Sequence, residues 1–228
     1  GWGVRVRVRV RVMMKTHRLR SSNPTPSLTL KDVKDDKGAL ASNPLFYETM
    51  DDLSADTIQA VSNEIQAVSR RLEVVLGADV FSAATVKSVL DSLREHYVAP
   101  VEDDLKLFFQ SAPGFKGIFT PMIKSGEKWM PDWKSRYFTE DIPALCIIEA
   151  LAALLNAEPD CEHSEHLACG VVKTPTIKTL IQWGQEKLGK EFLVGTTLNG
   201  RDLKEFTCIP QNFGATSINS MKELHMLD

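Results

Sequence analysis

The sequence has no G-x-G-x-x-G pattern between a strand and a helix and no G-x-x-x-x-G-K-[ST] pattern, so it contains no recognisable glycine-rich loop for the phosphates of a nucleotide. Any nucleotide that the protein uses must therefore be bound by residues outside this chain. A G-x-S-x-G pattern is missing too, which leaves a serine-hydrolase nucleophile without support. These absences exclude the commonest phosphate-binding and serine-hydrolase sites.

Cysteine and long apolar runs are also scarce. The 228 residues include four cysteines, too few and too scattered for a disulfide framework in a chain of this length. A membrane-spanning helix needs roughly 20 apolar residues, whereas the longest apolar segment, IPALCIIEALAALL, is interrupted by Glu149. We therefore expect a globular protein, with the cytoplasm as its default compartment.

Basic residues are concentrated at the N-terminus. Seven of the 27 Lys and Arg residues lie within residues 1–20, which contain no acid, so residues 21–228 carry 20 basic against 30 acidic side chains. The segment VRVRVRVRV alternates as an amphipathic strand would, yet its arginines would repel one another on one face, and no partner strand follows. We interpret residues 1–42 as a disordered, low-complexity basic leader and loop, with an organellar targeting segment as the alternative. Because the sequence begins with Gly and its first methionines are Met13 and Met14, we expect the chain to be part of a longer protein.

Helical periodicity dominates the middle of the chain. Apolar residues at three- and four-residue spacing predict a helix within residues 50–77, and Gly77 is suited to end it in a left-handed conformation. The segment SAATVKSVLDSLREHY predicts a second helix that begins at the capping residue Ser82.

Two further helices are indicated by prolines in their first turns, where the missing N–H costs nothing. The first is the apolar segment from Ile142 to about Asn156, with Pro143 in its first turn. The second is TPTIKTLIQWGQEKLG, for which Thr174 is the expected cap and Gly189 the expected end.

Residues 98–135 lack this periodicity. Beyond one or two helical turns in VEDDLKLFF, their prolines and glycines predict a long loop. The spacing of Phe115, Phe119, Trp129 and Trp133 suggests that this loop is packed by its own aromatic side chains.

No series of strands alternates with the predicted helices. The predicted fold is therefore all-α, a bundle-like helical domain with long loops over residues 43–207. An insertion is expected near residues 157–172, and residues 208–228 are expected to form a loose tail.

A cluster of possible metal ligands lies in CEHSEHLAC. Cys161, His163, His166 and Cys169 are chemically suitable for zinc, but their spacing differs from that of zinc fingers, in which two ligand pairs are separated by a dozen or more residues. A polar surface loop that happens to contain Cys and His is the favoured interpretation, and a zinc-dependent regulator is the alternative.

The segment RYFTED brings several functional side chains to the start of the apolar helix. Arg136 could bind a carboxylate through both oxygens, because its guanidinium is a planar fork. Asp141 could orient and stabilise a catalytic histidine. The alternative is a capping network in which Thr139 or Asp141 caps the helix and Arg136 pairs with Glu140.

This segment, RYFTEDIP, together with NPLFYETM and KTPTIKTLIQWGQEKLGKEF, resembles the helical substrate domain of the octopine/opine dehydrogenase family. The resemblance covers most of residues 43–207. It implies a two-domain enzyme in which an N-terminal Rossmann domain binds NAD(P)H and an all-α domain closes over the substrates. Such enzymes condense an amino acid with a 2-oxo acid such as pyruvate and reduce the imine.

The resemblance also assigns roles to residues. It implies that Arg136, Tyr137 and Glu140 bind substrate and that the catalytic Asp141 partners a histidine. The family's histidine normally precedes a proline upstream of the NPLFYE-like segment, and no such dipeptide occurs here; His17 is not assigned this role. The NAD(P)H-binding domain is likewise absent from this chain, which we expect to be inactive alone. The alternative is a non-catalytic helical interaction module derived from the same fold.

Overall fold

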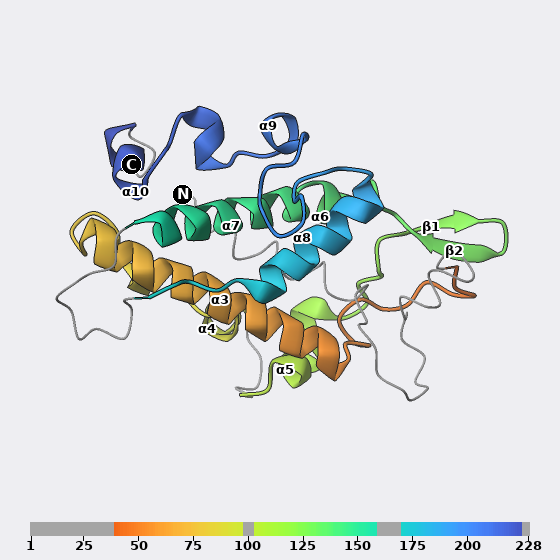
Figure 1. Cartoon of the computed structure of the whole chain (residues 1–228). Coiled ribbons are helices and arrows are strands. Elements are labelled where there is room, and N and C mark those ends of the chain that lie inside the picture. The colour runs from red at the N-terminus through yellow and green to blue at the C-terminus, as the bar shows by residue number, and fades with distance from the viewer. Residues whose placement is uncertain (1–38, 98–102, 159–169, 225–228) are drawn as a thin grey trace.

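The computed structural model describes residues 39–97, 103–158 and 170–224, and residues 1–38 of the leader predicted over 1–42 lie outside this range (Figure 1). The elements in chain order are α3 (Asp52–Leu76), the 3₁₀ turn η2 (Ala83–Thr85), α4 (Val89–His96), α5 (Leu105–Ser111), η3 (Pro113–Phe115), β1 (Met122–Ser125), β2 (Lys128–Pro131), α6 (Arg136–Thr139), α7 (Asp141–Ala157), α8 (Pro175–Leu188), α9 (Leu203–Phe206), η4 (Pro210–Phe213) and α10 (Ile218–Glu223).

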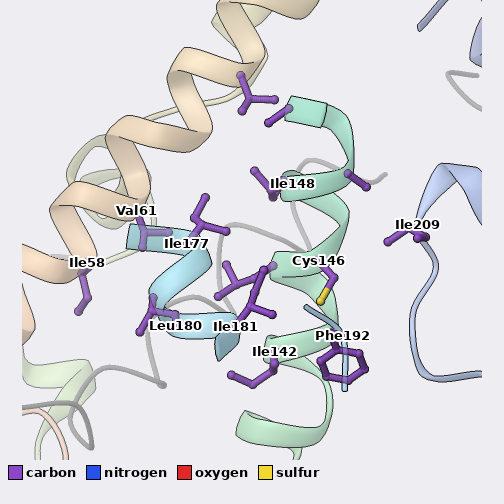
Figure 2. Packing of buried hydrophobic residues seen from close by; sticks show 14 of the residues in the cluster. Ile58, Val61, Ile142, Cys146, Ile148, Ile177, Leu180, Ile181, Phe192 and Ile209 are labelled. Atoms are coloured by element: carbon purple, nitrogen blue, oxygen red, sulfur yellow. The ribbon is translucent and has the colours of Figure 1, made fainter. Parts of the chain in front are cut away.

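The three longest helices, α3, α7 and α8, pack against one another and form the centre of the domain (Figure 1). Each fully buried Ile or Leu side chain at this contact contributes roughly 1.5–3 kcal/mol. The helices and their shared core confirm the predicted all-α class. Figure 2 shows this contact as Ile58 and Val61 from α3, Ile142 and Cys146 from α7, and Ile177, Leu180 and Ile181 from α8.

Helix α3 begins and ends close to the predicted positions. The Asp51 carboxylate accepts a hydrogen bond from the backbone N–H of Ser54 at 2.8 Å and so caps the first turn. The helix ends at Gly77, whose φ of 85° favours glycine, although its ψ of 146° differs from that of the left-handed helical conformation.

The start of α8 is capped by a residue that is distant in sequence. Thr174, the predicted cap, makes no capping hydrogen bond, and its hydroxyl instead donates to Glu149 Oε2 at 2.5 Å. The two carboxylate oxygens of Glu64, on α3, accept from the backbone N–H groups of Thr176 and Ile177 at 2.8 and 2.9 Å. A negative charge at a helix N-terminus is favourable, so Glu64 joins α3 to α8.

Glu64→Ala is expected to lower the free energy of unfolding by about 1–2 kcal/mol, because two N–H groups of α8 lose a charged acceptor. Urea unfolding followed by circular dichroism measures the change. Glu186→Ala, an exposed acid on α8, is the matched control and should shift stability by less than about 0.5 kcal/mol. Equal effects of the two substitutions would refute the capping role.

The second predicted helix is broken. Residues 83–85 form a 3₁₀ turn, and the side chain of Ser82 makes no capping hydrogen bond, so the predicted start is wrong. Helix α4 begins six residues later, where Ser88 accepts from the N–H of Asp91 at 3.1 Å. The N–H of Val89 donates to Ser62 Oγ of α3 at 3.0 Å, which fixes α4 against the longest helix.

The expected loop over 98–135 contains regular structure that the sequence prediction missed. After α5, strands β1 and β2 form an antiparallel hairpin whose turn holds Gly126 at a φ of 63°. The prediction that the loop packs on its own aromatics is wrong for Phe119, which is 61% exposed. Phe115 is buried, with its ring centroid 5.3 Å from that of Phe109 in the same segment and 4.5 Å from that of Tyr47 outside it.

The described part of the predicted loose tail, residues 208–224, also packs on the domain, which corrects that prediction for these residues. Helix α10 begins with a capping box formed by Ser217 and Ser220, and Ile218 within it is fully buried. The N–H of Ile218 donates to a carboxylate oxygen of Glu158, just beyond α7, at 2.9 Å. Among the described helices, none has the length and apolarity to cross a membrane.

Candidate functional site

The RYFTED segment forms a short helix followed directly by a long one. Helix α6 is a single turn, and Glu140 is both its C-terminal cap and the N-terminal cap of α7. The Glu140 side chain makes no capping hydrogen bond, and the Thr139 hydroxyl bonds backward to the Ser135 carbonyl at 3.4 Å. Capping by Thr139, one part of the alternative explanation of this segment, is therefore not how α7 begins.

Arg136 and Tyr137 lie at the edge of the hydrophobic core. Arg136 is exposed, and its guanidinium carbon lies 5.9 Å from the ring centroid of Tyr137. The half-buried Tyr137 ring is nearly parallel to that of buried Phe46, with centroids 6.3 Å apart. The side chain of Tyr137 thus rests on the core while the guanidinium remains accessible to a ligand.

Asp141 is in a different environment from the other predicted site residues. It is the first residue of α7 and is 2% exposed, whereas Arg136 and Glu140 are exposed. The positive end of the helix dipole favours a negative charge at this position. The structure therefore places the exposed Arg136 on α6 and the buried Asp141 on α7, and Glu140 is the single residue between these two helices.

Three large rings pack behind this segment. Phe138, on α6, is 2% exposed and its ring centroid lies 4.9 Å from that of Trp133 and 6.1 Å from that of Trp183, on α8. The two tryptophans are 5.9 Å apart, and the Lys187 ammonium lies 5.8 Å from the Trp133 centroid. Sequence reasoning did not connect these rings with the site, since Trp183 is 50 positions from Trp133 and no local pattern joins them.

The next residue of α8, Gly184, lies against the start of α7. A Cβ atom at this position would lie 2.0 Å from Cδ1 of Ile142, the residue that follows Asp141. A glycine within an otherwise helical pattern is the one sequence signal of such a close approach, and the prediction of this helix did not use it.

The predicted metal ligands Cys161, His163, His166 and Cys169 lie outside the described residues. Within the described parts of the chain, no group of three or more His, Cys, Asp or Glu residues could hold a metal ion. Burial, with a further contribution from the carboxylate of Glu149, raises the pKa of the Cys146 thiol, so this group is a neutral packing element of α7.

The described residues do not fit a dinucleotide cofactor. The strands within residues 39–97, 103–158 and 170–224 form a single antiparallel hairpin, whereas a pyrophosphate site of the Rossmann type needs a parallel strand followed by a glycine-rich turn and a helix. The sequence lacks that glycine pattern as well.

Comparison with known proteins gives consistent matches. Octopine dehydrogenase of Pecten maximus is 31% identical over 180 residues, which cover 78% of this chain and 41% of that enzyme. Tauropine dehydrogenase of Arabella iricolor is 29% identical over 187 residues. A solved structure of octopine dehydrogenase with NADH and L-arginine superposes with a TM-score of 0.69 at 25% identity, covering 95% of this chain and 46% of that one.

The chain thus spans about two fifths of the length of the curated relatives that it matches. The model of the family described as NAD/NADP octopine/nopaline dehydrogenase, alpha-helical domain, matches residues 18–163. By that match, this chain belongs to the octopine/nopaline dehydrogenase family and carries its alpha-helical domain.

Proposed function

We propose that this chain is the substrate-binding part of an NAD(P)-dependent opine dehydrogenase-like oxidoreductase, which condenses an amino acid with a 2-oxo acid such as pyruvate. The reduced nicotinamide would supply hydride to the imine and would be bound by residues outside the described ones. The observation that carries the proposal is the position of exposed Arg136 and buried Asp141 on either side of the α6–α7 junction. Related proteins of known structure were solved with pyruvate, L-arginine or agmatine.

Arg136 suits the carboxylate of the 2-oxo acid. Its guanidinium is exposed, always charged and able to donate two parallel hydrogen bonds. Tyr137 limits the space beside the guanidinium, because its ring is held against Phe46. The exposed Glu140 carboxylate is one residue from Asp141 and suits the positively charged amino group of the second substrate.

Asp141 suits the role of the acid that orients a histidine and stabilises its charged form. Its position at the N-terminus of a 17-residue core helix holds the carboxyl group rigidly. Among the described residues the sole histidine is His96, whose Nδ1 lies 2.7 Å from the Ser92 carbonyl of its own helix. The partner histidine would therefore come from outside the described residues.

Arg136→Ala is expected to weaken pyruvate binding to the 228-residue chain at least about tenfold, since a charge-assisted hydrogen bond contributes about 1.5–3 kcal/mol. Chemical-shift titration with pyruvate measures the dissociation constant. Arg70→Ala removes an exposed arginine from α3 and should leave binding unchanged.

A non-catalytic interaction module would respond differently. Such a protein would bind pyruvate no better than acetate and would be indifferent to the loss of Arg136. If pyruvate binding is unchanged in Arg136→Ala, the guanidinium of Arg136 is not part of the binding site.

A further inference from the structure

Two consecutive residues of α8 contact residues near the two ends of the Arg136–Asp141 segment. Trp183 packs on Phe138, which lies two residues after Arg136. Gly184 has no side chain and so leaves room for the side chain of Ile142, the residue after Asp141. Helix α6 contacts both α7 and α8, and Figure 1 shows it leading into α7 beside α8. The two predicted site residues thus share one support on α8.

Helix α6 needs such support. It has four residues, and a single helical turn is unstable on its own because few hydrogen bonds offset the ordering of its backbone. Its orientation must therefore come from the side chains that it buries. Phe138 is the one residue of α6 that is fully buried, and its ring forms a triangle with those of Trp133 and Trp183, each ring in contact with the other two.

Trp133 is the third ring of this cluster and lies in the loop between β2 and α6. Its ring contacts Phe138 edge-on and Trp183 edge-on, the geometry that aromatic pairs prefer. The Lys187 ammonium lies 5.8 Å from its centroid, within the range of a cation–π contact. Trp133 is half-buried, so it adds less to the central core than the fully packed residues of α7 and α8.

We propose that Trp133 is a positioning residue of the substrate site: its ring packs against both Phe138 and Trp183 and so fixes where α6 presents the Arg136 guanidinium relative to Asp141. The proposal deepens the function inferred above and rests on it for the identity of the ligand. Small displacements of a binding group are costly in such sites, since an error of about 1 Å can reduce a rate about 100-fold. The ring cluster supplies the rigidity that an isolated helical turn lacks.

Trp133→Leu, made in the 228-residue chain, tests the proposal. We expect pyruvate to bind about tenfold more weakly, and the side-chain ¹⁵Nε–H signal of Arg136 to leave its wild-type position, because the guanidinium moves relative to the Tyr137 ring. Trp133→Phe keeps an aromatic ring and should restore most of the affinity. Trp129→Leu is the matched control, because Trp129 is also half-buried but lies on β2, outside the ring cluster.

The two proposals fail in distinguishable ways. If the wild-type chain binds no pyruvate, the assigned ligand is wrong, and the Arg136 signal still reports whether Trp133 positions the guanidinium. If Trp133→Leu leaves both the signal and the affinity at wild-type values, the positioning role is refuted. Equal losses of affinity in Trp133→Leu and Trp129→Leu would reduce the role of Trp133 to general stability and would also overturn the proposal.

Discussion

Gln185→Leu is expected to lower the free energy of unfolding by about 4 kcal/mol. Gln185 is buried on α8, and its Oε1 accepts from the backbone N–H groups of Phe192 and Leu193, both at 2.8 Å. Its Nε2 donates to the Leu193 carbonyl at 3.1 Å. Leucine has a similar size but leaves three buried backbone groups without these bonds, and each such group costs about 1–3 kcal/mol.

Urea unfolding at equilibrium measures this change, and hydrogen exchange at Phe192 and Leu193 locates it. Gln182→Leu is the matched control, since Gln182 is exposed on the same helix, and its effect should stay within about 0.5 kcal/mol. A loss below about 1 kcal/mol in Gln185→Leu would mean that the turn after α8 is held by other contacts.

Local signals in the sequence correctly predicted helix starts and ends where these depend on residues near in sequence. Pro143 lies in the first turn of α7, and Gly189 ends α8 with a φ of 63° and a ψ of 32°, both as predicted. Each depends on the backbone preference of a single residue type. Periodic apolar residues likewise identified α3, because burial of one face is encoded within the helix itself.

The errors in the predicted helix starts arise where residues distant in sequence determine where the helix begins. Thr174 is a reasonable cap by local rules, but Glu64, more than 100 positions earlier, provides the acceptors for α8. Ser82 is an equally good cap by type, yet the bond from Val89 to Ser62 on α3 fixes the later start of α4. Single-sequence patterns contain no information on such partners until the tertiary fold brings them together.

In the candidate site too, the local sequence predicted some features, whereas others depend on residues distant in sequence. The residue types in RYFTED indicated a carboxylate clamp beside an acid, and the structure separates them into exposed Arg136 and buried Asp141. The roles of these two residues remain predictions. Their support by Trp133, Trp183 and Gly184 depends on the packing of α8 against α6 and α7, which no spacing in the sequence expresses.

The close approach at Gly184 leads to the second large expected effect. In most helices Gly→Ala stabilises by about 1 kcal/mol, because alanine loses less backbone entropy. Here a Cβ atom would lie 2.0 Å from Cδ1 and 2.6 Å from Cγ1 of Ile142, which is fully buried. Overpacking of this kind costs about 3 kcal/mol, so Gly184→Ala should destabilise the protein by about 2 kcal/mol.

A double-mutant cycle identifies the contact responsible. Ile142→Ala alone should cost about 2–5 kcal/mol through the cavity that it creates. If the two side chains compete for the same space, the double variant with Gly184→Ala should be less damaged than the sum of the single variants by about 3 kcal/mol, the whole cost of overpacking. Strictly additive losses would show that the strain of Gly184→Ala is absorbed elsewhere.

The same variant links packing to the proposed site. The space at Gly184 can be recovered by moving the start of α7 away from α8, which would displace Asp141, the residue before Ile142. Arg136 is held through Phe138 and the ring of Trp183, one residue earlier on α8, so the two site residues would shift by different amounts. Gly184→Ala is therefore expected to weaken pyruvate binding about tenfold at temperatures where the chain remains folded. An unchanged affinity, together with the predicted loss of stability, would show that α6 and α7 move as one unit and that their spacing does not depend on α8.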